Sequence, residues 1–214
     1  MPRTKLLKIK RYSTLVNTFD DSCKFKGKWL SEHFKNSNPI VLELGAGAAN
    51  LSISLATKYA NKNYIAVDIK SDRLYIGALK ALLTQQYNIA FLKCRIEEIK
   101  NYFTASEIQE LWITFPDPQP KKCNEKHRLL NRNFLSFYRD ILSQDSKIYF
   151  KTDSDMLYNY AIDEIAFVKG RILEISHDVH SENDVSSDIL IKTIYEQRFI
   201  DMGKTIKYLC FSLF

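Results

Sequence analysis

Short apolar runs alternate with helix-like segments along most of this chain, and that alternation constrains the fold more than any other feature. The segments with apolar residues at helical spacing are 48–60, 71–87, 127–142 and 154–170. The apolar runs that predict strands are 39–47, 63–69, 89–95, 110–116, 146–153, 171–179 and 205–214. Strict alternation of strands and helices is typical of a parallel sheet with helices on both faces. Because no full crossover helix separates the last two strands, an antiparallel final strand is expected.

The predicted fold is therefore a Rossmann-like α/β domain that spans residues 39–214 and contains a mostly parallel, seven-stranded sheet. The segment 176–189 is polar, acidic and rich in turn-forming residues, which predicts a mobile loop before the last strand. Residues 1–38 precede the first predicted strand and form a separate, basic arm in this interpretation.

Positive charge is distributed unevenly along the chain. Lys and Arg total 31 against 25 Asp and Glu, a net charge of +6, and residues 1–35 alone hold nine basic and three acidic residues. A second basic cluster consists of Lys121, Lys122, Lys126, Arg128 and Arg132. Clusters of this kind favour contact with phosphates, so we interpret them as a nucleic-acid surface that includes the arm 1–38. A solvated charged surface is the alternative.

Several classes of protein are disfavoured by the same composition. No apolar run is long enough to cross a bilayer and charges interrupt the first residues, which predicts a cytoplasmic protein that does not bind membranes. The four histidines lack metal-site spacing, so no metal is expected. No C-x-x-C pair occurs, and reduced thiols are expected at Cys23, Cys94, Cys123 and Cys210.

The stretch "ELGAGAAN", residues 43–50, follows the first predicted strand and is the first candidate ligand site. Ligands of open α/β sheets bind beyond the carboxyl ends of the strands. Gly45 and Gly47 would let a ligand approach the backbone closely, and Asp68 at the end of the second strand would accept hydrogen bonds from ribose hydroxyls. Both a nicotinamide dinucleotide and S-adenosylmethionine fit these features.

Two residues of that stretch favour S-adenosylmethionine. A dinucleotide fingerprint that starts at Gly45 needs a glycine at position 50, where this chain has Asn50. Glu43 would repel a pyrophosphate at the following helix N-terminus, whereas S-adenosylmethionine carries an ammonium and a sulfonium and no phosphate.

The stretch "FPDPQPKK", residues 115–122, surrounds one carboxylate with three prolines. Proline fixes φ and donates no backbone hydrogen bond, so this stretch does not suit the interior of a sheet. Pro116 and Pro118 are expected to stiffen the loop that holds Asp117. The alternative is an aspartate that only caps a turn.

In their order, "LELGAG", "FPDPQPKK", "KTD" and "TIYEQRFIDMG" resemble the bacterial tRNA (guanine-N7)-methyltransferase family, which has a class I methyltransferase fold. This resemblance implies methyl transfer from S-adenosylmethionine to a guanine of the tRNA variable loop. The sequence leaves both a monomer and a homodimer open. It also implies the roles of individual residues. Those expected at the cofactor are Glu43, Gly45, Gly47, Asp68 and Asp117, with Asp117 also catalytic. Those expected at the target RNA are Lys121, Asp153, Thr193, Ile194, Tyr195 and Glu196.

The chemistry of guanine N7 agrees with a carboxylate in this place. N7 has an exposed lone pair and no proton to lose, so alignment with the methyl group matters more than a base, and good alignment supplies roughly 7–11 kcal/mol. A fixed carboxylate stabilises the positive charge that develops on the ring. Carboxylates also accept hydrogen bonds from the N1 and N2 edge, which would let Asp117, Asp153 or Glu196 read the base.

Purely structural roles stay open for two of these motifs. Asp153 lies where a helix N-cap is expected, and Thr193 with Glu196 forms a T-x-x-E capping box.

Two other functions also stay open. One is a methyltransferase for an exocyclic amine of another base, although "DPQP" lacks the aromatic that would stack a flipped base. The other is a nucleic-acid-binding relative without catalysis.

Overall fold

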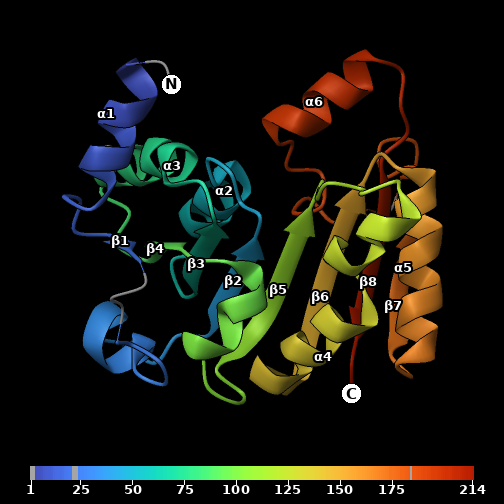
Figure 1. Ribbon diagram of the computed structural model, residues 1–214, viewed down its shortest axis with the longest axis horizontal. Coiled ribbons are helices and arrows are strands. Elements are labelled where there is room, and N and C mark those ends of the chain that lie inside the picture. Colours follow the sequence, from blue (N-terminus) through green and yellow to red (C-terminus); the bar gives the residue numbers. More distant parts are fainter. Residues whose placement is uncertain (1–2, 21–23, 184) are drawn as a thin grey trace.

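The computed structural model describes residues 3–20, 24–183 and 185–214, which form one twisted sheet with helices on both faces (Figure 1). Within the described residues the sheet has eight strands in the order β1-β4-β3-β2-β5-β6-β8-β7. Their bounds are β1 Thr18–Phe19, β2 Ile40–Leu44, β3 Asn63–Asp68, β4 Ile89–Lys93, β5 Ile108–Thr114, β6 Leu142–Thr152, β7 Arg171–Ser176 and β8 Lys207–Ser212. Neighbours pair in parallel except β8, which is antiparallel to both β6 and β7. The mostly parallel sheet and its antiparallel C-terminal strand are confirmed.

The predicted number of strands is wrong by one, because the short strand β1 lies in the segment 1–38 and pairs with β4 at the edge of the sheet. A pairing of two residues leaves no periodic signal in the sequence. The described part of this segment also packs against the domain. The Tyr12 hydroxyl donates to the carbonyl oxygens of Phe19 and Phe91, both at 2.8 Å, and Trp29 is fully buried. The role of this segment as a nucleic-acid surface stays a prediction.

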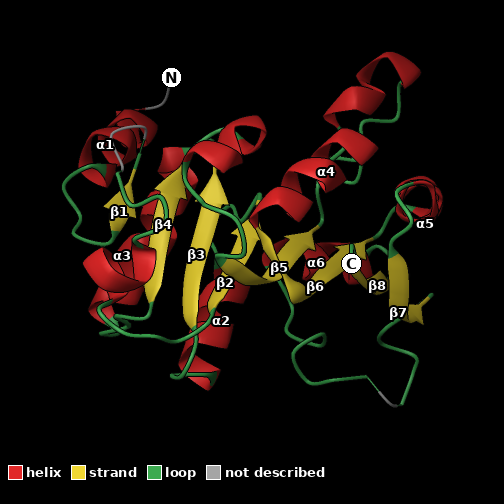
Figure 2. Cartoon of the chain, turned by 90° about the horizontal axis from the view of Figure 1, so that it is seen from below, coloured by secondary structure: helices red, strands yellow, loops and turns green. Residues whose placement is uncertain are grey.

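Helices cover both faces of the sheet (Figure 2), and side chains that alternate along the strands divide the core between these two faces. In β2, Val41 packs in the cluster with helices α2 and α3, whereas Leu42 packs in the cluster with α4 and α5. The α-helices are α1 Arg3–Tyr12, α2 Asn50–Lys58, α3 Ser71–Leu83, α4 Arg132–Ile141, α5 Asp155–Phe167 and α6 Ile194–Asp201. Short 3₁₀ or π turns are η1 Trp29–Phe34, η2 Ile96–Asn101 and η3 Lys122–His127. Every residue of β2 is buried, and four of its five positions are apolar; the exception is Glu43.

The strand order reverses between β2 and β5, and this switch point determines where a ligand can bind. Loops after the two strands diverge to opposite faces of the sheet and leave a crevice at the carboxyl ends. Helix α6 lies above the same ends (Figure 1). The chain before α6 is anchored on α2, because Asp188 accepts hydrogen bonds from Lys58 Nζ at 2.6 Å and from the Tyr59 hydroxyl at 2.8 Å.

No helix in the described part of the chain is long and apolar enough to cross a membrane. The prediction of reduced thiols stays a prediction, and Cys23 lies outside the described residues.

Candidate active site

A cleft of about 920 Å³ opens at the carboxyl ends of β2, β5 and β6. Its size is within the range of small-molecule sites in proteins. Of the predicted site residues it brings together Glu43, Gly45, Gly47, Asp117, Asp153, Thr193, Ile194 and Tyr195. Asp68, Lys121 and Glu196 do not line it. The cleft thus has a cofactor side, formed by the loop after β2, and a target side, formed by the loop after β5 together with α6.

On the cofactor side, the loop after β2 turns sharply through two glycines. Gly45 has φ of 71° and Gly47 has φ of 58°, and a Cβ on either would meet nothing within 4 Å. The backbone conformation therefore favours glycine at both positions, and the space beside each Cα is left open for a ligand. Ala49 adopts the same left-handed conformation with φ of 54° at the start of α2.

Asp68, the last residue of β3, supports this loop. One carboxylate oxygen accepts a hydrogen bond from the backbone N–H of Gly47 and the other from that of Lys70, both at 2.8 Å. The side chain is nearly buried at 8% exposure. Its observed contacts are with the backbone of the chain, and the predicted contact with a ribose stays a prediction.

Glu43 is a buried carboxylate at the floor of the cleft, with only 3% exposure. Its Oε2 accepts hydrogen bonds from the backbone N–H of Ser52, at 3.1 Å, and from the Ser52 hydroxyl, in the first turn of α2. Burial raises the pKa of Glu43 to about 7, and the nearby Asp68 carboxylate acts in the same direction. A cation beside Glu43 would restore its ionised form, which makes this position suited to a positively charged ligand.

Helix α3 fixes the same loop by close contact, a feature that the sequence analysis missed. A Cβ on Gly77 would lie 2.4 Å from the carbonyl oxygen of Ala48 and 2.9 Å from the Phe91 ring. Only glycine allows the helix to approach the loop so closely. An isolated glycine inside the helical pattern 71–87 was the available signal.

On the target side, Asp117 lies in a strained turn that opens into the cleft. Phe115 has φ of 49° and donates its backbone N–H to the carbonyl oxygen of Lys151 at 2.8 Å. Asp117 is exposed, and its Oδ1 accepts the backbone N–H of Gln119 at 3.0 Å. The aspartate therefore caps its own turn with one oxygen, and it also lines the cleft.

Arg128 holds the far end of that turn and does not point to solvent. Its Nε and Nη2 donate to the carbonyl oxygen of Gln119 at 3.3 and 3.2 Å, and its guanidinium lies 4.4 Å from the centre of the Tyr160 ring. Arg128 is buried and Arg132 is paired with Glu164 at 2.6 Å. The interpretation of Arg128 as a phosphate-binding residue is wrong, because its charge faces the backbone. Lys121, Lys122 and Lys126 are exposed.

Asp153 completes the target side together with Lys204, with which it forms an ion pair. Helix α5 is capped by Ser154, whose hydroxyl accepts the backbone N–H of Leu157 at 3.2 Å. Asp153 is thus not the N-cap, and its carboxylate lines the cleft. Lys204 also lines the cleft and was not among the predicted residues.

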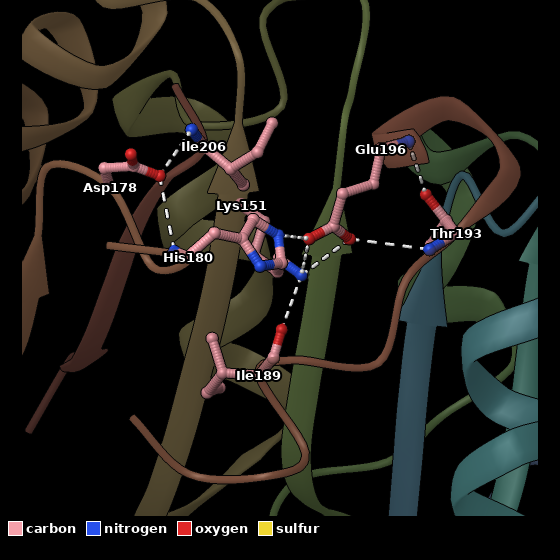
Figure 3. Close-up of polar contacts among 7 residues, drawn as sticks. All are labelled: Lys151, Asp178, His180, Ile189, Thr193, Glu196 and Ile206. Carbon is pink, nitrogen blue, oxygen red and sulfur yellow. Dashed lines mark hydrogen bonds and ion pairs between the residues drawn. The ribbon is translucent and has the colours of Figure 1, made fainter. Parts of the chain in front are cut away.

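The segment 193–196 forms the start of α6. The Thr193 hydroxyl accepts the backbone N–H of Glu196 at 3.1 Å, which confirms a capping box. Ile194 and Tyr195 are exposed beside the cleft, but Glu196 is fully buried and paired with Lys151 behind it (Figure 3). The predicted contact of Glu196 with RNA has no support in this arrangement.

Comparisons with known proteins agree with this geometry. Residues 37–209 match the family described as "Putative methyltransferase". The tRNA (guanine-N(7)-)-methyltransferase of Christiangramia forsetii is 40% identical over 91% of this chain and 87% of its own length. The enzyme of the same name from Porphyromonas gingivalis is 40% identical over 88% of this chain and 77% of its own length. The chain belongs to the tRNA (guanine-N7)-methyltransferase family.

Solved structures confirm the fold of this family member. An antibiotic-related methyltransferase has a TM-score of 0.66 at 17% identity and covers 90% of this chain. The 16S rRNA methyltransferase KamB has a TM-score of 0.67 at 10% identity and covers 87% of this chain. These identities show a shared class I methyltransferase fold and nothing about the target. The relatives confirm that the sequence motifs resemble those of the tRNA (guanine-N7)-methyltransferase family.

Proposed function

We propose that this protein transfers a methyl group from S-adenosylmethionine to N7 of a guanine in tRNA. The observation that carries this proposal is one cleft in which the Glu43 loop faces Asp117 and α6, in a chain of the tRNA (guanine-N7)-methyltransferase family.

The cofactor side has the chemistry that S-adenosylmethionine requires. When bound, this cofactor supplies a methyl group on a sulfonium centre. Glu43 would face its positive charge, since burial has already raised the pKa of that carboxyl to about 7 and a cation would offset the cost of ionising it. Gly45 and Gly47 would border the cofactor without side chains, and Asp68 would hold their loop in shape.

Asp117 would act on the charge of the target base. Because N7 has no proton, no residue needs to serve as a general base. Methylation leaves a positive charge on the guanine ring, and the exposed Asp117 carboxylate in the cleft would stabilise that charge as it forms. Its turn is fixed by Gln119 and Arg128 before any substrate binds, which reduces the reorganisation that catalysis requires.

The target side would bind the nucleotide and its neighbours. Asp153 would accept hydrogen bonds from the guanine edge, while Thr193, Ile194 and Tyr195 would line the entry of the base. Lys121 lies outside the cleft and is exposed, which suits a contact with a phosphate that carries no sequence information.

The decisive experiment supplies labelled S-adenosylmethionine and unmodified tRNA and identifies the methylated nucleoside. We expect N7-methylguanosine, and chain cleavage specific to N7-methylated guanine would locate it in the variable loop. Label in another nucleoside would contradict the proposed target. Cofactor binding without any transfer to tRNA would contradict the proposed reaction.

A further inference from the structure

Lys151 and Glu196 form a buried ion pair behind the target side of the cleft (Figure 3). Lys151 is 1% exposed and Glu196 is fully buried. The lysine Nζ donates to both carboxylate oxygens, at 2.6 and 2.7 Å, and to the carbonyl oxygen of Ile189 at 2.6 Å. His180 Nε2 lies 2.9 Å from the same carboxylate. One carboxylate thus joins β6, the segment before α6 and α6 itself.

This pair is one of the few attachments of helix α6 to the sheet. Among its described residues, Glu196 is the one that is buried. Ile194 is 64% and Tyr195 is 43% exposed, so the apolar side chains at the start of the helix do not hold it in place. Phe199 adds a ring contact with Phe115, whose centroid lies 5.6 Å away. Ile200 is also partly buried and packs against the core. A helix of eight residues is marginal alone, so its position follows from these few contacts.

Lys151 connects the same point to the loop of Asp117. Its carbonyl oxygen accepts the backbone N–H of Phe115 at 2.8 Å, and its Nζ lies 5.9 Å from the centre of the Phe115 ring. The backbone of one residue therefore fixes the start of the Asp117 loop, while the side chain of that residue fixes α6. The two parts of the target side share a single support.

Stability alone does not account for a pair of this kind. Burying two charges has a desolvation penalty that their attraction hardly exceeds, and apolar replacements of similar volume are often as stable. Burial lowers the pKa of Lys151, while the Glu196 carboxylate opposes that change. The pair instead fixes a geometry: two short hydrogen bonds from Lys151 hold Glu196 of α6, and a third holds Ile189 in the segment before it, which restricts the position of the helix more narrowly than apolar contacts would.

We propose that Lys151 and Glu196 are positioning residues that set α6 against the Asp117 loop and thereby determine the affinity for the target RNA, although neither touches it. This inference rests on the proposed function and changes one part of it. Glu196 acts through Thr193, the N-cap of its helix, and through the exposed Tyr195, and it does not read the base.

The test compares Glu196→Gln and the double variant Lys151→Met/Glu196→Leu with the wild-type protein. In Glu196→Gln we expect the KM for tRNA to rise about tenfold, with the Kd of S-adenosylmethionine changed by less than about twofold. In the double variant, thermal stability recovers to near the wild-type value but the raised KM for tRNA remains. Recovery of both stability and KM would reduce the pair to a structural role and overturn the proposal, as would an equal loss of affinity for cofactor and tRNA.

A matched control is Lys62→Met, which removes an ion pair with Glu110 that joins β3 to β5 away from the cleft. It should leave both affinities unchanged. Hydrogen exchange of the α6 amides provides a measurement that needs no activity. We expect exchange of residues 194–201 to be faster in Glu196→Gln than in the wild-type protein and in Lys62→Met. Unchanged exchange would overturn the positioning role. If wild-type protein fails to methylate tRNA, the proposed function fails, and the exchange result still decides whether the pair positions α6.

Discussion

The two sides of the cleft are held in place by different means. On the cofactor side, the end of the neighbouring strand β3 fixes the loop, because the Asp68 carboxylate accepts hydrogen bonds from the N–H groups of Gly47 and Lys70. On the target side, Glu196 attaches α6 to Lys151, which is 45 positions away, and Arg128 holds the Asp117 turn from within its own loop. The cofactor side is therefore part of the sheet domain itself, whereas the target side is assembled on top of it. Changes on the two sides should therefore separate cofactor affinity from activity on RNA.

The largest effect is expected for Asp117→Asn, which keeps the side-chain oxygen that accepts the N–H of Gln119 but removes the charge. We expect kcat to fall by about a hundredfold or more, because the developing charge on the base loses its counterion. Cofactor affinity should stay within about twofold. Methyl transfer to tRNA and calorimetric titration of S-adenosylmethionine measure the two quantities, and near-normal turnover would remove Asp117 from the mechanism.

Glu43→Gln tests the cofactor side by charge alone. We expect the affinity for S-adenosylmethionine to fall by about tenfold or more, because a cation loses its buried counterion.

The same variant should change the dependence of stability on pH. The pKa of Glu43 is raised to about 7, so the carboxyl contributes stability below its ordinary pKa and loses that contribution as the pH rises through 7. The loss is on the order of 3 kcal/mol. Without cofactor, Glu43→Gln should thus be more stable than the wild-type protein at pH 8 and similar at pH 5. Thermal unfolding at both pH values measures this, and equal stability at pH 8 would contradict the raised pKa.

Arg128→Met tests the support that Arg128 gives to the Asp117 turn. The variant loses two hydrogen bonds to the Gln119 carbonyl oxygen, and its apolar side chain still packs on Tyr160. We expect kcat to fall about tenfold and the free energy of unfolding to fall by about 1–3 kcal/mol. Lys126→Met, which removes an exposed charge from the same cluster, is the control. Equal effects of the two variants on kcat would show that Arg128 acts only by charge.

Gly77→Ala tests the close packing of α3 against the loop on the cofactor side. Its added methyl group would collide with the Ala48 carbonyl oxygen, so the loop after β2 must move or α3 must shift. We expect a loss of about 1–3 kcal/mol in stability and a weaker affinity for S-adenosylmethionine. If tRNA affinity fell while cofactor affinity did not, the separation of the two sides would be wrong.

The smallest effect is expected for Lys121→Ala, since Lys121 is exposed and outside the cleft. Binding of tRNA should weaken a few-fold, and the slope of log affinity against log salt should decrease by about 1. Cofactor affinity should not change. A slope identical to that of the wild-type protein would exclude Lys121 from phosphate contacts.

The sheet could be predicted from the sequence because its signals are local. The run 40–44 is wholly buried, and the glycines at 45 and 47 adopt the left-handed conformations that their residue type favours. The converging site residues followed from the rule that ligands bind at the carboxyl ends of strands. The presence of Asp117 and Asp153 in one cleft agrees with that rule.

The parts that could not be predicted depend on side-chain contacts that leave no periodic pattern in the sequence. Lys151 and Glu196 are 45 positions apart, and nothing in "KTD" or "TIYEQRF" indicates that these two charges meet in the interior. In the sequence, Arg128 is one of several clustered basic residues. In the structure, its side chain donates a hydrogen bond to the carbonyl oxygen nine positions earlier and is buried. Strand β1 has two residues and depends on the Tyr12 hydroxyl, which lies outside any periodic pattern.

Strand β8 comes last in the chain but lies between β6 and β7 in the sheet. In the described sheet, β7 pairs only with β8. It therefore has no hydrogen-bonding partner strand until β8 has been synthesised and inserted. A ribosome-bound chain that ends before β8 would expose both β7 and the open edge of β6, a condition that favours aggregation. This part of the sheet therefore forms only after β6, β7 and β8 have all been synthesised.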